Sequence, residues 1–307
     1  MLIDDVHRYI SLRRALGFKL DKTDRYLEAF TRHAAANGDS HIRTATALAW
    51  TAVVSSTPGS RYRRLQEIAD FARFLHAEDA AHEIPQHHHY YRPCVRPAPY
   101  IYTSDELVRM LHAAANLRHQ KPSPLRRHVH AMLIGLLAAT GLRVSEALNL
   151  RLGDLLPGGV LHIRQTKFDK SRLVPMHASV VAALEAYLRV RAKVAGVDDH
   201  VFLTVGGRPM GLGTVHAAFH AILNKAKIAP DRPRRPRIHD LRHTFATRAL
   251  TQSHAMRRED VARDFVALST YLGHSEIRHT YWYLEATPHL MGDIAGAAEM
   301  LAAGVIA

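Results

Sequence analysis

Histidines, an arginine and a tyrosine lie close together in the last third of the chain. The run HDLRH spans residues 239–243, His274 follows it, and Tyr283 stands nine residues beyond His274. An imidazole can carry a proton to or from a reacting group, and a guanidinium binds phosphate oxygens through paired hydrogen bonds. In a chain with a large excess of positive charge, these groups favour chemistry on a phosphate ester.

Tyr283 has two interpretations, a nucleophile or a packed aromatic residue. It lies in the run TYWYL at residues 280–284. A tyrosine hydroxyl has a pKa near 10 and is almost wholly un-ionised at pH 7, so attack on phosphorus requires a base and nearby cations. Those groups would have to come from Arg143, Arg242, His239 and His274.

Arg143 and Glu146 form a second candidate, because residues three apart share one face of a helix. An exposed ion pair of this kind is common and contributes little to stability. The pair follows directly on the apolar run 131–142 and the glycine turn at Gly141, where an arginine would be held in place. From this motif alone, a surface ion pair and a functional arginine both stay open.

Lys167 and Lys170 lie between two short runs rich in β-forming residues, Val160–Gln165 and Arg172–Pro175. The pattern predicts a hairpin with both lysines at its polar tip. Such a tip is usually just solvated. A lysine on a flexible loop can instead reach into a cleft and donate a proton to a leaving oxygen.

The four-residue spacing of His239 and His243 also resembles the HExxH pattern of zinc proteases. Here Asp240 replaces the required glutamate, and Arg242 would place a cation beside the metal, which is unfavourable. The preceding run RPRRPR at 232–237 is a rigid basic approach that suits a phosphate better than a metal. We therefore predict no metal site in this cluster.

The charge balance points to a polyanionic partner. The 307 residues carry a formal net charge of +13, and only eight of the 41 basic residues are lysines. Arginine matches phosphate oxygens bidentately, although a GC-rich coding sequence would also raise its share. This excess of positive charge favours nucleic acid as the partner before an anionic membrane surface.

Several features indicate a soluble protein of the cytoplasm. Cys94 is the one cysteine of the sequence, so no intramolecular disulfide can form. Residues 1–10 carry Asp4 and Asp5 and lack the apolar stretch of a signal peptide. The most apolar run, residues 131–142, is too short to cross a membrane.

Hydrophobic periodicity predicts a mainly α chain with a small antiparallel β-sheet. Three prolines between residues 93 and 99 mark an extended linker, so we expect a helical first domain at 1–92, a linker at 93–100 and a second domain at 101–307. Residues 57–60 (TPGS) are expected to break the chain before the fourth helix. The expected helices lie at about residues 6–16, 22–36, 44–54, 61–75, 103–117, 122–140, 142–150, 178–195 and 212–227.

The fourth of these helices carries a basic face opposite its apolar one. A solvated face is one interpretation, and contact with the phosphates of duplex DNA is the other. The residues concerned are Arg61, Arg63, Arg64 and Arg73.

These segments together resemble the tyrosine recombinases of the phage-integrase family, in particular Xer-like site-specific recombinases. Any one segment would be a weak signal, but they occur in the order of the family and cover essentially the whole chain. The segments are TGLRVSEALNLRLGDL (140–155), TKFDKSRLVP (166–175), HDLRHTFAT (239–247), LGHSEI (272–277) and the tyrosine nine residues beyond His274.

The resemblance implies one site that breaks and rejoins DNA through a 3′-phosphotyrosyl link and needs neither ATP nor a metal. It implies these roles: Arg143 and Arg242 clamp the scissile phosphate, Lys167 is the general acid for the 5′-oxygen, His239 and His274 take the two histidine positions, Glu146 supports the site from behind, and Tyr283 is the nucleophile.

The resemblance also implies the architecture and the partners. Residues 1–92 would be a helical, SAM-like core-binding domain, and residues 101–307 an α+β catalytic domain that ends in a helix. The partner is double-stranded DNA, bound by a homotetramer on paired sites, alone or with sister recombinases, and no membrane is involved. The apolar tail, residues 290–307, would dock on a neighbouring protomer. Relaxation of DNA like that of a type IB topoisomerase, and DNA binding without cleavage, are the alternatives.

Two departures from the family pattern bear on these assignments. The stretch between Arg242 and His274 is roughly nine residues longer than in compact members, with polar residues at 252–260. Tyr281 lies two residues from Tyr283, so the choice of nucleophile depends on the spacing from His274.

Overall fold

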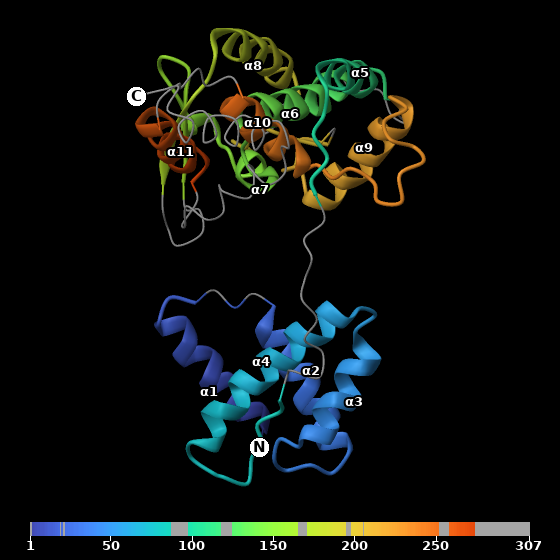
Figure 1. Cartoon of the computed structure of the whole chain (residues 1–307), viewed down its shortest axis with the longest axis vertical. Helices are drawn as coiled ribbons and strands as arrows, with labels where there is room; N and C mark the ends of the chain where they lie inside the picture. Colours follow the sequence, from blue (N-terminus) through green and yellow to red (C-terminus); the bar gives the residue numbers. More distant parts are fainter. Residues whose placement is uncertain are drawn as a thin grey trace, which may run out of the picture. The chain divides into compact units, whose positions relative to one another are not determined.

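The computed structural model divides the chain into two compact units, Met1–Pro97 and Ala98–Ala307 (Figure 1). The structure describes residues 2–18, 20, 22–86, 98–117, 125–164, 171–194, 198–204, 206–251 and 258–273. Most of the predicted linker lies outside these ranges, so the domain limits 92 and 101 stay predictions. Outside them too are Lys167, His274, Tyr283 and the tail 290–307.

The described part of the first unit is helical. Its helices are α1 (Leu2–Ala15), α2 (Thr23–Ala36), α3 (Thr44–Val54) and α4 (Pro58–His76). The apolar residues predicted to face inward on α2 and α4 are buried in one core. They are Leu27, Phe30, Ala34, Leu65, Ile68, Phe71, Ala72 and Leu75.

The break predicted at residues 57–60 is wrong in one respect, because most of this stretch already belongs to α4. Thr57 is the N-cap, and its side-chain oxygen accepts a hydrogen bond from the Ser60 amide at 3.2 Å. Pro58 occupies the first turn, where its missing N–H has no partner to lose. A proline therefore begins this helix, although it would interrupt a helix interior.

The basic face of α4 is partly structural. Arg61 Nε donates to the carbonyl of Ser55 at 3.0 Å, and Arg64 donates to the carbonyl of Val54 while lying 4.7 Å from the ring centre of Tyr26. The last carbonyls of a helix lack partners within it, so these arginines stabilise the end of α3. The first interpretation, a freely solvated face, therefore does not hold for Arg61 and Arg64.

The second unit combines helices with one small sheet. Its described elements are α5 (Ser104–Ala115), α6 (Arg126–Thr140), α7 (Val144–Leu148), the 3-10 turn η2 (Leu152–Asp154), β1 (Leu155–Leu156), β2 (Val160–Ile163), β3 (Arg172–Pro175), α8 (Ala178–Arg191), α9 (Leu212–Lys225), α10 (Asp240–Thr251) and α11 (Arg258–Leu272). This confirms a mainly α fold with a small antiparallel sheet.

The sheet contains the predicted hairpin and one strand more. Its order is β1-β2-β3, and both pairs are antiparallel. Ile163 pairs with Arg172 and Leu161 pairs with Val174, so these four residues share a face. Leu161, Ile163 and Val174 are buried, which places Arg172 on the inward side of the sheet.

Helix α6 forms the centre of the second unit. It packs against α5, α7, α8 and α10 (Figure 1). Its residues Leu133, Leu136 and Leu137 are almost fully buried. The apolar run that begins in α6 is therefore part of the core.

None of the helices that the structure describes is long and apolar enough to cross a membrane.

Candidate active site

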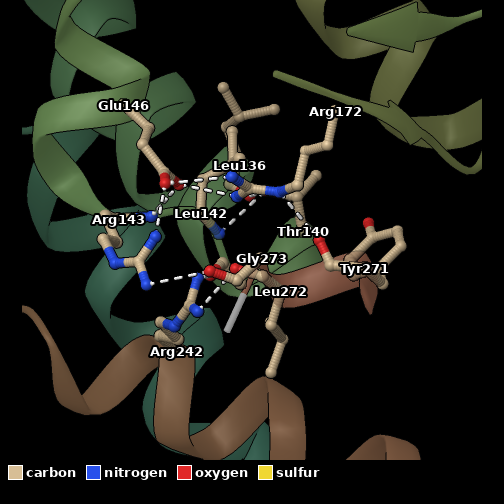
Figure 2. A network of polar contacts seen from close by, with 11 residues as sticks. Leu136, Thr140, Leu142, Arg143, Glu146, Arg172, Arg242, Tyr271, Leu272 and Gly273 are labelled. Atoms are coloured by element: carbon tan, nitrogen blue, oxygen red, sulfur yellow. Dashed lines mark hydrogen bonds and ion pairs between the residues drawn. The ribbon is translucent and has the colours of Figure 1, made fainter. Parts of the chain in front are cut away.

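Arg143 and Arg242 come together where the ends of four elements meet. Arg143 is the N-cap of α7, and Arg242 lies in the first turn of α10. Figure 2 shows both guanidinium groups directed at the end of α11, with β3 contributing Arg172 from the other side. The structure therefore describes part of the predicted site, and Glu146 and His239 belong to this part as well.

The turn at Gly141 brings the end of α6 against α10. Gly141 has a φ of +62°, which costs a glycine nothing, and its carbonyl accepts a hydrogen bond from Arg242 Nη1 at 2.7 Å. A Cβ at this position would lie 2.5 Å from Cδ1 of Phe245 and 3.0 Å from Cδ2 of Leu272. The turn therefore requires glycine for its backbone angle and for its space.

Glu146 binds two arginines at once. Its Oε1 accepts from Arg143 Nη1 at 2.7 Å and from Arg172 Nη1 at 3.0 Å. Its Oε2 accepts from the Arg143 amide at 2.9 Å and from Arg172 Nη2 at 2.7 Å. Burial of this carboxyl raises its pKa, but the hydrogen bonds and charges of Arg172 and then Arg143 outweigh burial and lower the pKa to about 2.

The end of α11 binds three arginines through consecutive carbonyl groups. Carbonyls at a helix C-terminus lack intrahelical partners and form the negative end of the helix dipole, so they attract cations. Figure 2 shows the contacts: Arg172 Nε donates to Tyr271 O at 2.9 Å, Arg242 Nη2 to Leu272 O at 2.7 Å, and Arg143 Nη2 to Gly273 O at 3.3 Å.

Arg143 and Arg242 differ in exposure. The Arg143 side chain is 33% exposed, whereas Arg242 is 2% exposed and is held by the carbonyls of Gly141 and Leu272. Hydrogen bonds to carbonyl oxygens do not cancel the formal charge of a guanidinium. Arg242 therefore brings a fixed positive charge to the end of α11, whereas Arg143 is also paired with the Glu146 carboxylate.

His239 directly precedes α10 and keeps an exposed surface. Desolvation of its ring, and then the charges of Arg242 and Arg237, lower its pKa to about 4. Its ring meets that of His243 edge-on, with the ring centres 4.9 Å apart. His239 is thus neutral at pH 7 and can donate one hydrogen bond and accept another.

Asp240 fixes the beginning of α10. Its carboxylate accepts from the Arg237 amide at 2.8 Å and from Arg237 Nη2 at 3.0 Å. Among the described residues, two groups of three possible metal ligands occur, at His41, Asp79 and His82 and at Asp198, Asp199 and His200.

The described half of the predicted site holds Arg143, Glu146, His239 and Arg242. Lys167, His274 and Tyr283 lie outside the described residues, but the elements that lead to two of them are placed. Strands β2 and β3 flank the stretch that carries Lys167, and α11 ends two residues before His274.

Arg172 is the residue of this network that the sequence interpretation did not single out. It lies in the segment 166–175, directly after the lysines of the predicted hairpin tip. A signal was available, because strand alternation places Arg172 on the same face as the buried Val174. An arginine on an inward strand position needs an acceptor, and Glu146 and Tyr271 provide it.

Comparisons with known proteins show the family of the chain. The model of the "Phage integrase family" matches residues 101–289. A putative integrase/recombinase, y4rB, of Sinorhizobium fredii is 39% identical over 93% of this chain and 93% of its own length. The tyrosine recombinase XerD of Halalkalibacterium halodurans is 29% identical over 76% of this chain and 72% of its own. The Tn1549 transposon integrase, solved in complex with transposon right end DNA, has a similar fold, with a TM-score of 0.67, 20% identity and 98% coverage of both chains.

Proposed function

Because the chain belongs to the phage integrase family and is a tyrosine-type site-specific DNA recombinase, we propose that Arg143 and Arg242 hold the scissile phosphate of its DNA. One observation carries this proposal: both guanidinium groups are fixed by adjacent carbonyls, Gly273 and Leu272, at the end of one helix. Two arginines held side by side can bind the non-bridging oxygens of a single phosphate.

The arginines would act mainly in the transition state. When an oxygen attacks phosphorus, negative charge builds up on the equatorial oxygens of the five-coordinate phosphorane. Donors fixed in advance stabilise this charge more than they stabilise the bound substrate, which is the requirement for catalysis. Loss of one such donor costs on the order of 3 kcal/mol in the barrier.

Tyr283 is the proposed nucleophile and Lys167 the proposed general acid. The phenolic oxygen of Tyr283 forms a bond to phosphorus and gives its proton to a neighbouring base, for which the neutral imidazole of His239 is suited. The bond from phosphorus to the 5′-oxygen breaks, and Lys167 gives that oxygen a proton. The 3′-phosphotyrosyl link keeps the energy of the phosphodiester, so attack by a 5′-hydroxyl rejoins a strand without ATP. No step calls for a metal.

The two histidines complete the proposed site. His239 is neutral at pH 7, so it adds hydrogen-bonding capacity without adding charge beside the two arginines. His274 follows the pinned end of α11 by two residues, which supports its assignment to the same site. The carboxylate of Glu146 accepts hydrogen bonds from the side chain and from the backbone amide of Arg143.

The wider assignments are proposed as well. Residues 1–92 form the core-binding domain, and exposed arginines there, such as Arg63 and Arg73, contact DNA phosphates. Exchange between two duplexes cleaves four strands in all and each cleavage uses one tyrosine, which supports a homotetramer on paired sites. Because the substrate is double-stranded DNA, we place the activity in the cytoplasm.

The test is the trapping of the covalent intermediate. A binding site selected from random duplex DNA is prepared with a nick beside the cleaved bond, so that the released fragment diffuses away and the protein stays attached. We expect wild type and Tyr281→Phe to form the adduct and Tyr283→Phe to form none. An adduct from Tyr283→Phe but not from Tyr281→Phe would overturn the assignment of the nucleophile.

The same preparation separates the alternative activities. Strand exchange between two copies of the selected site identifies recombination. Relaxation of supercoiled DNA without exchange would identify activity like that of a type IB topoisomerase. Tight binding of the site without any adduct would identify a binding protein of the same fold.

A further inference from the structure

We propose that Arg172 is a positioning residue that binds Glu146 and the end of α11, and thereby leaves the charge of Arg143 available for the DNA phosphate. This inference rests on the proposed function of Arg143. It concerns a residue that does not itself touch the phosphate and acts through its neighbours. Figure 2 shows Arg172 on the far side of Glu146 from Arg143.

All three side-chain nitrogens of Arg172 are engaged. Nε binds Tyr271 O at 2.9 Å, and the two terminal nitrogens bind the two oxygens of Glu146 at 3.0 and 2.7 Å. The planar fork of arginine matches a carboxylate in this way, and lysine cannot reproduce it. Arg172 of β3 therefore contacts both α7, through Glu146, and α11, through Tyr271.

The guanidinium of Arg172 is largely buried and lies close to the backbone of Gly273. Its side chain is 11% exposed. Gly273 has a φ of +68°, and a Cβ there would lie 2.8 Å from Nη1 of Arg172 and 3.1 Å from its Cζ. The backbone at Gly273 approaches the guanidinium closely, and the same residue offers its carbonyl to Arg143. The position of Arg172 thus limits where Gly273 can lie.

The balance of formal charges gives Arg172 its function. Arg143 and Glu146 alone would form a neutral pair, and a neutral pair attracts a phosphate weakly. Arg172 adds a second cation to the buried carboxylate, whose side chain is 7% exposed, so the trio carries one net positive charge. Arg143 is the more exposed of the two cations, at 33% against 11%, and it presents that charge.

Neutral substitutions test this inference. We compare wild type, Arg172→Gln, Glu146→Gln and the double variant Arg172→Gln/Glu146→Gln by the rate of adduct formation and by the affinity for the nicked duplex. Loss of hydrogen bonds to a charged group predicts that Arg172→Gln is about ten- to a hundredfold slower. The double variant removes the carboxylate as well, so it should regain part of both the rate and the affinity.

A matched control separates charge from packing. Arg191 of α8 is also buried, at 4% exposure, and it donates to the carbonyls of Asp198 and His200. Arg191→Gln should lower the melting temperature as Arg172→Gln does, and should leave the affinity for the nicked duplex unchanged. The rate of Arg172→Gln should also rise relative to wild type as the pH falls, because Glu146 then becomes protonated more readily.

The outcomes distinguish this inference from the proposed function. A double variant that is no better than Arg172→Gln in rate and in affinity would overturn the role of Arg172, as would an Arg172→Gln variant equal to wild type. Wild type that binds the duplex but forms no adduct would overturn the proposed function instead. In that case the pattern of affinities still decides whether Arg172 preserves the charge of Arg143.

Discussion

Arg242 donates a hydrogen bond to the carbonyl oxygen of Gly141 at 2.7 Å, although the two residues lie in different segments of the sequence. The turn at Gly141 is what allows this contact, because it ends α6 and carries the chain toward Arg143. The buried arginine and the left-handed glycine therefore depend on each other.

Gly141→Ala is expected to destabilise the protein strongly. The left-handed backbone costs an alanine about 1–2 kcal/mol. The new Cβ would in addition meet Phe245 at 2.5 Å, which forces a rearrangement. Urea unfolding measures the loss, and Gly213→Ala is the control, since nothing lies within 4 Å of a Cβ there. Equal unfolding free energies for the two variants would contradict this expectation.

Arg143→Ala and Arg242→Ala should have similar effects on cleavage and different effects on stability. Each removes one proposed phosphate donor, so each should slow adduct formation on the order of a hundredfold or more. Arg242 is 2% exposed and Arg143 is 33% exposed, so loss of Arg242 should lower the melting temperature far more. Single-turnover rates and thermal unfolding give the two comparisons. An Arg242→Ala variant as stable as Arg143→Ala would show that its carbonyl contacts contribute little.

Glu146 should make the free energy of unfolding decrease at acidic pH. Its pKa is lowered to about 2 in the folded protein, so its contribution is present above the unfolded value near 4.5 and is lost as the pH falls toward 2. The shift corresponds to an upper limit of about 3 kcal/mol at neutral pH. Urea unfolding of wild type and Glu146→Gln between pH 7 and pH 3 tests this, and the gap between them should narrow below pH 4.5. A constant gap would contradict it.

His239 should also make the protein less stable as the pH falls, although it gains a positive charge on protonation where Glu146 loses a negative one. Its pKa is lowered to about 4, so between pH 6.5 and pH 4 the unfolded chain binds a proton that the folded protein does not. Stability is therefore full above pH 6.5 and falls as the pH decreases through this window. His239→Gln should show a shallower decline over the same range in unfolding experiments. Parallel curves would indicate that His239 does not titrate differently in the two states.

The arginines of α4 should separate into structural and DNA-binding residues. Arg64→Ala removes a bond to the Val54 carbonyl and a contact with Tyr26, and is expected to cost about 1 kcal/mol of stability. Arg63→Ala should leave stability unchanged but weaken DNA binding uniformly across sequences, and reduce the salt slope by about one. Melting temperatures and binding titrations at several salt concentrations measure both. Loss of stability in Arg63→Ala would reverse this division.

The elements with strong local signals could be predicted closely. The helix at 44–54 has its predicted limits, and the helix expected from residue 103 begins there, with Thr103 as its N-cap. The error at residues 57–60 arose because proline was interpreted as a breaker although it stands at a helix start. Strand β1 was not predicted because its two residues, Leu155 and Leu156, are too few for alternation to be recognised.

The site was predictable as far as local spacing extends. The pairing of Arg143 with Glu146 follows from residues three apart, and the structure contains it. The contacts of Arg172 with Glu146 and Tyr271 join three segments that lie far apart in the sequence. Residue spacing cannot predict such contacts, because they depend on how the segments fold together. The assigned roles of the site residues stay predictions until the variants are measured.

The contacts at the end of α11 also limit how the protein can change in length. Each added residue turns a helix by about 100° and advances it by about 1.5 Å, so an insertion near Leu272 would move all three carbonyls away from their arginines at once. The beginning of α11, at Arg258, takes no part in these three contacts. In the sequence, the polar stretch 252–260 falls at this beginning of the helix and not at Gly273.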